Sequence, residues 1–169
     1  IDQVTTCYGS GADFAMSQKI SALSLGDAAL KRIGILKGLP ETEDQALVYL
    51  FMASSSLSGE DYEKLLDDFI RQFPANADGY LRRANYYASK GKDDQTWYDK
   101  AVADFNQALK VAQKKDDVYY NIGKLMYAYQ LSKPEKTYKD WTYDTALKNL
   151  RQAIAIDPLP VYTQLEGDI

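Results

Sequence analysis

The sequence predicts an all-α protein, and three observations support that prediction. Apolar residues recur at spacings of three and four along most of the chain, which is the period of one helix face. No stretch alternates apolar and polar residues over a convincing length, so no strand is expected. Two consecutive stretches, 77–112 and 116–158, repeat one order of large and small residues, which indicates a helix pair that occurs twice.

The first two predicted helices form a pair near the start of the chain. One spans about 12–23 and the other about 27–37, where Gly38 and then Pro40 end the apolar pattern. We expect this pair, within 1–41, to be a degenerate repeat or a cap.

A capping box marks the start of the next helix. Thr42 and Gln45 have the spacing at which two side chains satisfy the free N–H groups of a helix N-terminus. The helix is expected over 42–57 and its successor over 60–73, which Pro74 ends.

The remaining helices follow the same period of apolar residues. They are expected over 77–90, 97–113, 117–131 and 141–156, with Gly91 at the C′ position after the first of them. The apolar residues of 159–169 predict one more helix, which would be the first helix of a truncated further repeat or a cap.

The repeated order of large and small residues has a packing reason. A small residue on one helix lets a bulky residue of its partner approach closely. The small positions are Ala84, Ala101 and Ala108 in the first stretch, and Gly123, Ala146 and Ala153 in the second. The bulky positions are Tyr80, Tyr87, Tyr98 and Phe105, then Tyr119, Met126, Tyr143 and Leu150.

This order resembles the tetratricopeptide repeat, as it occurs in multi-repeat proteins of bacteria. The resemblance implies a right-handed α-solenoid of stacked helix–turn–helix units. Three repeats would lie within 42–158, at about 43–74, 77–112 and 116–158, and the last ends in the Asp-Pro pair typical of the family. The first fits less well, because Leu65 replaces a small residue. A non-repeating helical bundle is the alternative.

Both well-matched repeats are longer than the usual 34 residues. Tyr80 and Tyr119 are 39 residues apart, and Ala101 and Ala146 are 45 apart. The insertions fall near 93–97 and 131–142, and each ends close to one of the two tryptophans, Trp97 and Trp141. We expect two neighbouring loops on one edge. The tryptophans either form an aromatic patch for a partner or extend the second helices and become buried.

Composition excludes several classes of function. The net charge of −4 argues against nucleic-acid binding, which needs clustered basic residues. No run of 18 apolar residues is present, so no membrane insertion is expected. The chain begins at Ile1 rather than Met, as expected of a mature or excised fragment, and both an exported or periplasmic and a cytoplasmic location stay open.

Catalytic and metal-binding constellations are missing from the sequence. Histidine is absent and Cys7 is the single cysteine, so no transition metal, cofactor or catalytic site is expected. The acidic pair at Asp116 and Asp117 falls at a predicted helix start, where negative charge is favourable. We therefore do not expect an enzyme.

The resemblance implies a concave groove lined by the first helices of the repeats, which would bind a protein or peptide. The implied groove residues are Leu81, Arg82, Asn85, Asp117, Tyr120, Asn121, Lys124 and Tyr127. A non-catalytic interaction scaffold is the first functional hypothesis. The second is an exported carbohydrate- or nutrient-binding component, in which Trp97 and Trp141 serve as stacking platforms.

Overall fold

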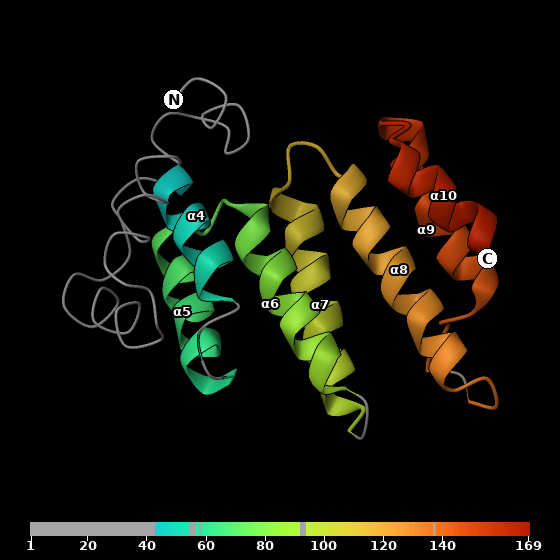
Figure 1. The fold of residues 1–169 in the computed structure, drawn as a ribbon, viewed down its shortest axis with the longest axis horizontal. Helices are drawn as coiled ribbons and strands as arrows, with labels where there is room; N and C mark the ends of the chain where they lie inside the picture. Colours follow the sequence, from blue (N-terminus) through green and yellow to red (C-terminus); the bar gives the residue numbers. More distant parts are fainter. Residues whose placement is uncertain (1–42, 55–56, 58, 92–93, 137) are drawn as a thin grey trace. The chain divides into compact units, whose positions relative to one another are not determined.

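The computed structural model describes residues 43–169 apart from 55–56, 58, 92–93 and 137. The helices expected within 1–41, and the capping residue Thr42, lie outside the described residues. The chain divides into two compact units, Ile1–Pro74 and Ala75–Ile169, which are described separately. Every regular element of the described part is an α-helix, so the predicted all-α class is confirmed for these residues (Figure 1).

The described part of the first unit contains two helices, α4 (Glu43–Ala53) and α5 (Gly59–Gln72). They pack through a small core of apolar side chains. This core consists of Ala46, Tyr49, Leu50, Ala53, Leu65, Leu66 and Phe69. Leu65 is buried, so the large residue that departs from the repeat pattern is accommodated in the core.

The second unit contains five helices in chain order (Figure 1). They are α6 (Ala77–Lys90), α7 (Thr96–Val111), α8 (Asp116–Ser132), α9 (Tyr143–Ile156) and α10 (Pro160–Asp168). Helix α6 packs closely on α7, α8 packs closely on α9, and α10 packs on α9. The unit is therefore two helix pairs followed by a single shorter helix.

Small residues lie at the contacts within these pairs, as the repeated pattern predicts. Ala84, Ala101 and Ala146 are fully buried. Gly123 approaches its partner helix so closely that an added Cβ would lie 2.9 Å from the Ala146 carbonyl oxygen. The alternation of small and large residues therefore sets how closely the helices of each pair approach.

Gly91 has a different role from the one expected. It ends α6 with a φ of −71°, which is a right-handed conformation open to any residue. However, an added Cβ would lie 2.5 Å from the Tyr98 ring. Glycine is needed here for close packing against Tyr98, and not for the left-handed turn of a C′ position.

Helix α9 starts two residues later than predicted. The Thr145 amide donates to Thr142 Oγ1 at 3.2 Å, and the Thr142 amide donates to Thr145 Oγ1 at 2.8 Å. This reciprocal capping box fixes Tyr143 as the first helical residue. Trp141 therefore precedes the helix, and its backbone does not have to continue along the axis of α9. None of the described helices is both long and apolar enough to cross a bilayer.

Candidate functional site

The predicted groove residues lie on α6 and α8, and five of them form what we call the polar strip. The strip consists of Arg82 and Asn85 on α6 and of Asp117, Asn121 and Lys124 on α8. Asn85 Nδ2 donates to Asn121 Oδ1 at 3.1 Å, so the two helices are bridged by their side chains. Asn121 Nδ2 donates in turn to the Asp117 carbonyl at 2.7 Å. The sequence-predicted surface is thus continuous from one helix to the other.

The exposure of these five residues fits a surface open to a partner. Asn85, Asp117 and Lys124 are exposed, and Arg82 and Asn121 are half-buried. Lys124 Nζ also lies 5.8 Å from the centre of the Tyr120 ring, near enough for a cation–π contact. The strip carries both signs of charge and two amides, which can donate and accept hydrogen bonds.

Of the other three predicted groove residues, Leu81 is buried, and Tyr120 and Tyr127 contact α10. Leu81 is only 6% exposed and belongs to the core, so its assignment to the groove was wrong. Tyr120 packs on Tyr162 of α10 with ring centres 4.8 Å apart. Tyr127 donates its hydroxyl to the Asp168 carbonyl at 2.9 Å. Both tyrosines are half-buried because α10 contacts this part of α8.

A buried acidic group fastens α10 beside the strip. The Tyr162 hydroxyl donates to Asp116 Oδ2 at 3.1 Å, and Asp117 Oδ1 lies 3.3 Å from the same hydroxyl. Burial and these two carboxylates raise the pKa of Tyr162 well above its usual range. Lys114 approaches Asp116 at 3.5 Å and also pairs with Asp157. The acidic pair therefore has a structural task in addition to starting a helix.

Trp97 lies in a cluster of aromatic and basic side chains at the start of α7. Its ring centre is 5.7 Å from that of Tyr87. Lys90 Nζ and Lys100 Nζ lie 4.6 Å and 4.2 Å from the Trp97 ring centre. The indole is half-buried, and both lysine ammonium groups lie within cation–π distance of its ring.

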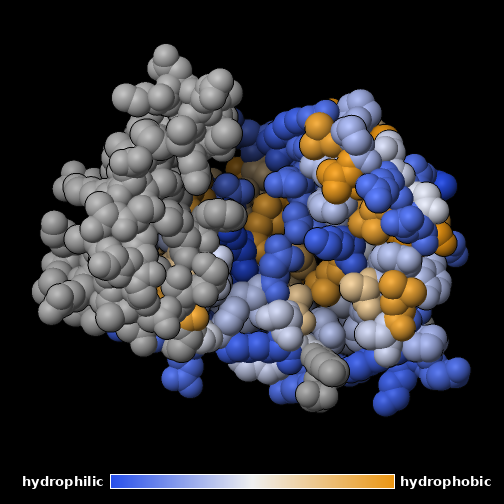
Figure 2. Space-filling model, viewed as in Figure 1, coloured by the Kyte–Doolittle hydropathy of each residue, from blue (hydrophilic) through white to orange (hydrophobic). Residues whose placement is uncertain are grey.

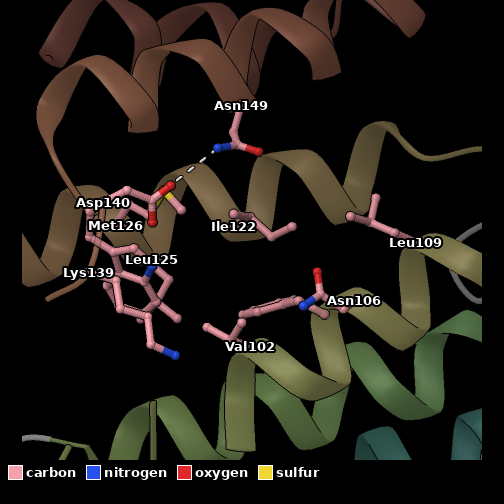
Figure 3. Close-up of a pocket in the computed structure, with 11 residues that line it drawn as sticks. Val102, Asn106, Leu109, Ile122, Leu125, Met126, Lys139, Asp140 and Asn149 are labelled. Carbon is pink, nitrogen blue, oxygen red and sulfur yellow. Dashed lines mark hydrogen bonds between the residues drawn. The ribbon is translucent and has the colours of Figure 1, made fainter. Parts of the chain in front are cut away.

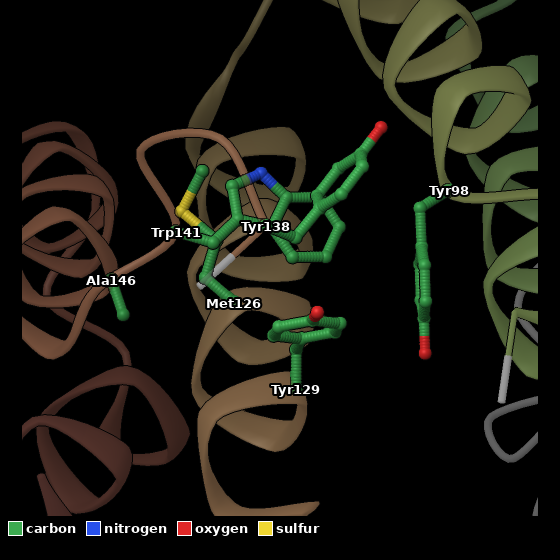
Figure 4. Close-up of a cluster of buried hydrophobic side chains, with 6 residues drawn as sticks. All are labelled: Tyr98, Met126, Tyr129, Tyr138, Trp141 and Ala146. Carbon is green, nitrogen blue, oxygen red and sulfur yellow. The ribbon is translucent and has the colours of Figure 1, made fainter. Parts of the chain in front are cut away.

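Trp141 lies in a separate aromatic cluster and is 3% exposed (Figure 4). The cluster consists of Tyr98, Met126, Tyr129, Tyr138, Trp141 and Ala146. The Trp141 ring meets Tyr98, Tyr129 and Tyr138 edge to face, at centre distances of 5.4, 5.5 and 4.7 Å. Edge-to-face packing is the geometry that aromatic rings favour.

The predicted patch of two tryptophans is therefore not formed. Trp141 is buried but does not extend α9, whereas Trp97 is the second residue of α7. Trp97 contacts the ring of Tyr87, whereas Trp141 contacts three other tyrosines. A buried Trp141 cannot serve as an exposed stacking platform, so this part of the carbohydrate-binding hypothesis was wrong.

The segment between α8 and α9 folds back onto α7, and we call it the Trp141 loop (133–142, described apart from 137). Lys139 Nζ donates to Asp99 Oδ1 at 2.6 Å, and the Tyr138 hydroxyl donates to the same oxygen. These two bonds lower the pKa of Asp99, and the Asp99 carboxylate raises the pKa of Lys139. Lys139 adopts a φ of 53°, a left-handed conformation that is unusual for a residue with a side chain.

A pocket of about 260 Å³ opens between α7 and α8 beside this loop (Figure 3). We call it the α7–α8 pocket. Its lining comprises Val102, Phe105, Asn106 and Leu109 of α7; Ile122, Leu125 and Met126 of α8; Lys139, Asp140 and Trp141 of the loop; and Asn149 of α9. Lys139 and Asp140 lie at one end in Figure 3, and Leu109 and Asn106 lie toward the other.

Sequence reasoning missed this pocket, although part of its signal was present. Val102, Phe105, Asn106 and Leu109 have the spacing of one helix face, but such a stripe is most often core. The pocket depends on where the Trp141 loop docks, which is decided by contacts with residues some 40 positions earlier, such as Asp99. Local pattern carries no information on that docking.

The buried carboxylate of Asp104 has a structural partner. Asp104 is buried at 6% exposure and accepts two bonds of 2.7 Å from the Arg83 guanidinium, which joins α7 to α6. Within the described residues, no three side chains of the acidic, histidine or cysteine type converge in a way that could hold a metal ion.

The view in Figure 2 shows hydrophilic and hydrophobic residues intermixed over the described surface of the second unit. That face carries no single continuous apolar area among the described residues. Comparisons of the chain with models of protein families, with curated proteins and with solved structures find no match.

Proposed function

We propose that this chain is a non-catalytic scaffold of tetratricopeptide-like repeats that binds an extended peptide segment along the polar strip. The bond between Asn85 and Asn121 is the observation that supports this proposal most. It joins α6 and α8, the first helices of two consecutive helix pairs. The buried alanines of both pairs support the same repeat assignment.

The chemistry of the strip suits a peptide backbone. A peptide in extended form presents alternating N–H donors and C=O acceptors. The side-chain amide of each asparagine uses one N–H in the bonds described above and retains a second as a donor. Asn85 also retains its side-chain oxygen Oδ1 as an acceptor for a partner. Lys124 and Asp117 flank the amides and would favour a partner with both signs of charge.

Pre-organisation strengthens the case for binding. The Asn121 side chain is held by one bond to Asn85 and one to its own helix. A side chain that is already fixed loses little rotamer freedom when a ligand arrives. The strip therefore resembles a prepared binding surface more than a merely solvated helix face.

The test begins with peptides selected from a random displayed library against the full chain. Affinity for a selected peptide is then measured by calorimetry for the wild type and for Asn121→Ala. We expect a loss of about 30-fold, which corresponds to a hot-spot truncation of about 2 kcal/mol. Gln152→Ala is the matched control, because Gln152 is an exposed amide side chain on α9 that belongs neither to the strip nor to the α7–α8 pocket.

Circular dichroism melts must show that both variants keep the fold. Selected peptides that bind Asn121→Ala and the wild type equally would contradict the proposal. Peptides whose affinity falls with Gln152→Ala alone would place binding on another surface and contradict it as well.

A further inference from the structure

The α7–α8 pocket lies on a different side of α8 from the polar strip. Ile122, Leu125 and Met126 line the pocket, whereas Asn121 and Lys124 belong to the strip. At about 100° per residue, the centres of these two sets lie roughly 120° apart around the helix. A ligand in the pocket would therefore not compete with a peptide on the strip, and the two sites can be tested independently.

The size and walls of the pocket favour a single apolar group. Seven of the eleven lining residues are apolar, and the aromatic rings of Phe105 and Trp141 are among them. Phe105 and Trp141 are buried and so are fixed in position. The volume of about 260 Å³ is below the roughly 300–1,000 Å³ of sites for drug-sized molecules. The space suits one ring with a short arm.

The charge at the pocket's loop end is negative. Lys139 and Asp140 are the two charged residues of the lining. Lys139 is engaged, because its Nζ lies 2.6 Å from Asp99 Oδ1, and in Figure 3 its ammonium extends toward α7. Asp140 is exposed, and its carboxylate makes no ion pair with the described residues. A ligand that enters here meets an uncompensated carboxylate.

Polar amides add hydrogen-bonding capacity along the rim. Asn149 Nδ2 donates to the Thr145 carbonyl at 2.8 Å and lies 3.6 Å from Met126 Sδ, so the side chain is held in place. Its carbonyl oxygen is an acceptor suited to an N–H donor. Acceptors and a carboxylate around an apolar space select for a donor-bearing, positively charged group.

We propose that the α7–α8 pocket is a second binding site, which takes an aromatic group attached to a cationic amine. The ring fills the space between α7 and α8 and contacts Phe105 and Met126. The ammonium lies at the loop end, where it pairs with Asp140. The same chemistry occurs in small aromatic amines and in an aromatic side chain next to a basic residue of a peptide, and the experiment below separates these sources.

Phenethylamine is the first probe, and 3-phenylpropionate is its matched opposite, with the same ring and the opposite charge. The full chain labelled with ¹⁵N gives one indole N–H signal for each of its two tryptophans. Trp97→Phe assigns the two signals. We expect phenethylamine to shift the Trp141 signal saturably and to leave Trp97 in place. We expect 3-phenylpropionate to bind several-fold more weakly.

Two carboxylates of the Trp141 loop test the charge argument. Asp140→Asn should reduce the preference for the amine over the acid about two- to fivefold, as an exposed ion pair of this kind allows. Glu135→Gln removes the same charge from the same loop at a residue outside the lining and should leave the preference unchanged. Equal binding of both probes by the wild type would overturn the proposal.

Two substitutions that fill the pocket test its position. Asn149→Phe fills it from α9, and Val102→Phe fills it from α7. Each should weaken phenethylamine binding at least tenfold, and the second variant guards against a local effect of losing the Asn149 amide. Retained affinity in both variants, or a Trp141 shift that does not saturate, would overturn the proposal.

A dipeptide of phenylalanine and lysine separates the two sources of the ligand. If it binds more tightly than phenethylamine, the source is a peptide, and the reverse order identifies a small amine.

Discussion

At the scale of single residues, the fold depends on where side chains are small. Ala101 and Ala146 are fully buried between paired helices, whereas Ala103 and Ala155 are exposed on the same two helices. Close-packed interiors tolerate little added volume. The four alanines therefore form a matched set in which only the environment differs.

Ala101→Leu and Ala146→Leu should each lower the free energy of unfolding by about 1–3 kcal/mol, because the three extra carbon atoms of leucine must fit a filled contact. Urea denaturation monitored by circular dichroism measures the change. Ala103→Leu and Ala155→Leu should shift the midpoint very little. A pair of buried variants as stable as the wild type would contradict the assigned repeat packing.

Glycine offers a second comparison of this kind. Alanine normally stabilises a helix interior by up to about 1 kcal/mol relative to glycine. At Gly123, however, the added Cβ would lie 2.9 Å from the Ala146 carbonyl oxygen and 3.0 Å from Leu150. At Gly167, nothing lies within 4 Å of the added Cβ. Gly123→Ala should therefore destabilise the protein, and Gly167→Ala should be neutral or stabilising. Thermal melts of the two variants that move in the same direction would contradict this account.

At the scale of elements, local pattern predicts the helices well and their connections poorly. The observed bounds of α5, α6 and α8 lie within one residue of the predicted ranges. Helix α9 starts later than the apolar pattern predicts, because the capping box of Thr142 and Thr145 fixes its N-terminus. The Trp141 loop could not be placed from sequence, because its position depends on contacts between residues about 40 positions apart.

The docking of that loop should depend on pH. The pKa of Asp99 is lowered in the fold. Its contribution to the stability of the docked loop is therefore present above the unfolded value of about 3.9, and it is lost as pH falls through the lower, folded value. The pKa of Lys139 is raised in the fold. Its contribution to the stability of the docked loop is present below the unfolded value of about 10.4, and it is lost as pH rises through the higher, folded value.

We expect the emission of Trp141, measured in the Trp97→Phe chain, to stay constant between these limits and to shift to longer wavelength in acid. Asp99→Asn should weaken loop docking at neutral pH and reduce its dependence on acid, because the titrating carboxylate is gone. Asp144→Asn, an exposed carboxylate of α9, is the control. An acid response that Asp99→Asn leaves unchanged would show that another group holds the loop.

At the scale of the whole molecule, the described residues have the all-α class that the sequence predicts, and the binding groove stays a prediction. The all-α class follows from apolar periodicity, and the polar strip follows from the face of α6 and α8 opposite their packing residues. Leu81, Tyr120 and Tyr127 were harder to place, because their burial depends on neighbouring elements, including α10 for the two tyrosines. The α7–α8 pocket could not be predicted from the local sequence pattern, because three helices and a loop contribute residues to its lining.

The central claim is that a peptide binds along the polar strip, and side-chain amide signals test it most directly. A library-selected peptide is added to the ¹⁵N-labelled chain, and the signals of Asn85 and Asn121 are followed, each assigned by substitution with alanine. The account predicts that both signals shift saturably with one dissociation constant, while the Trp141 indole signal stays in place. Unchanged signals from both asparagines at saturating peptide would contradict it.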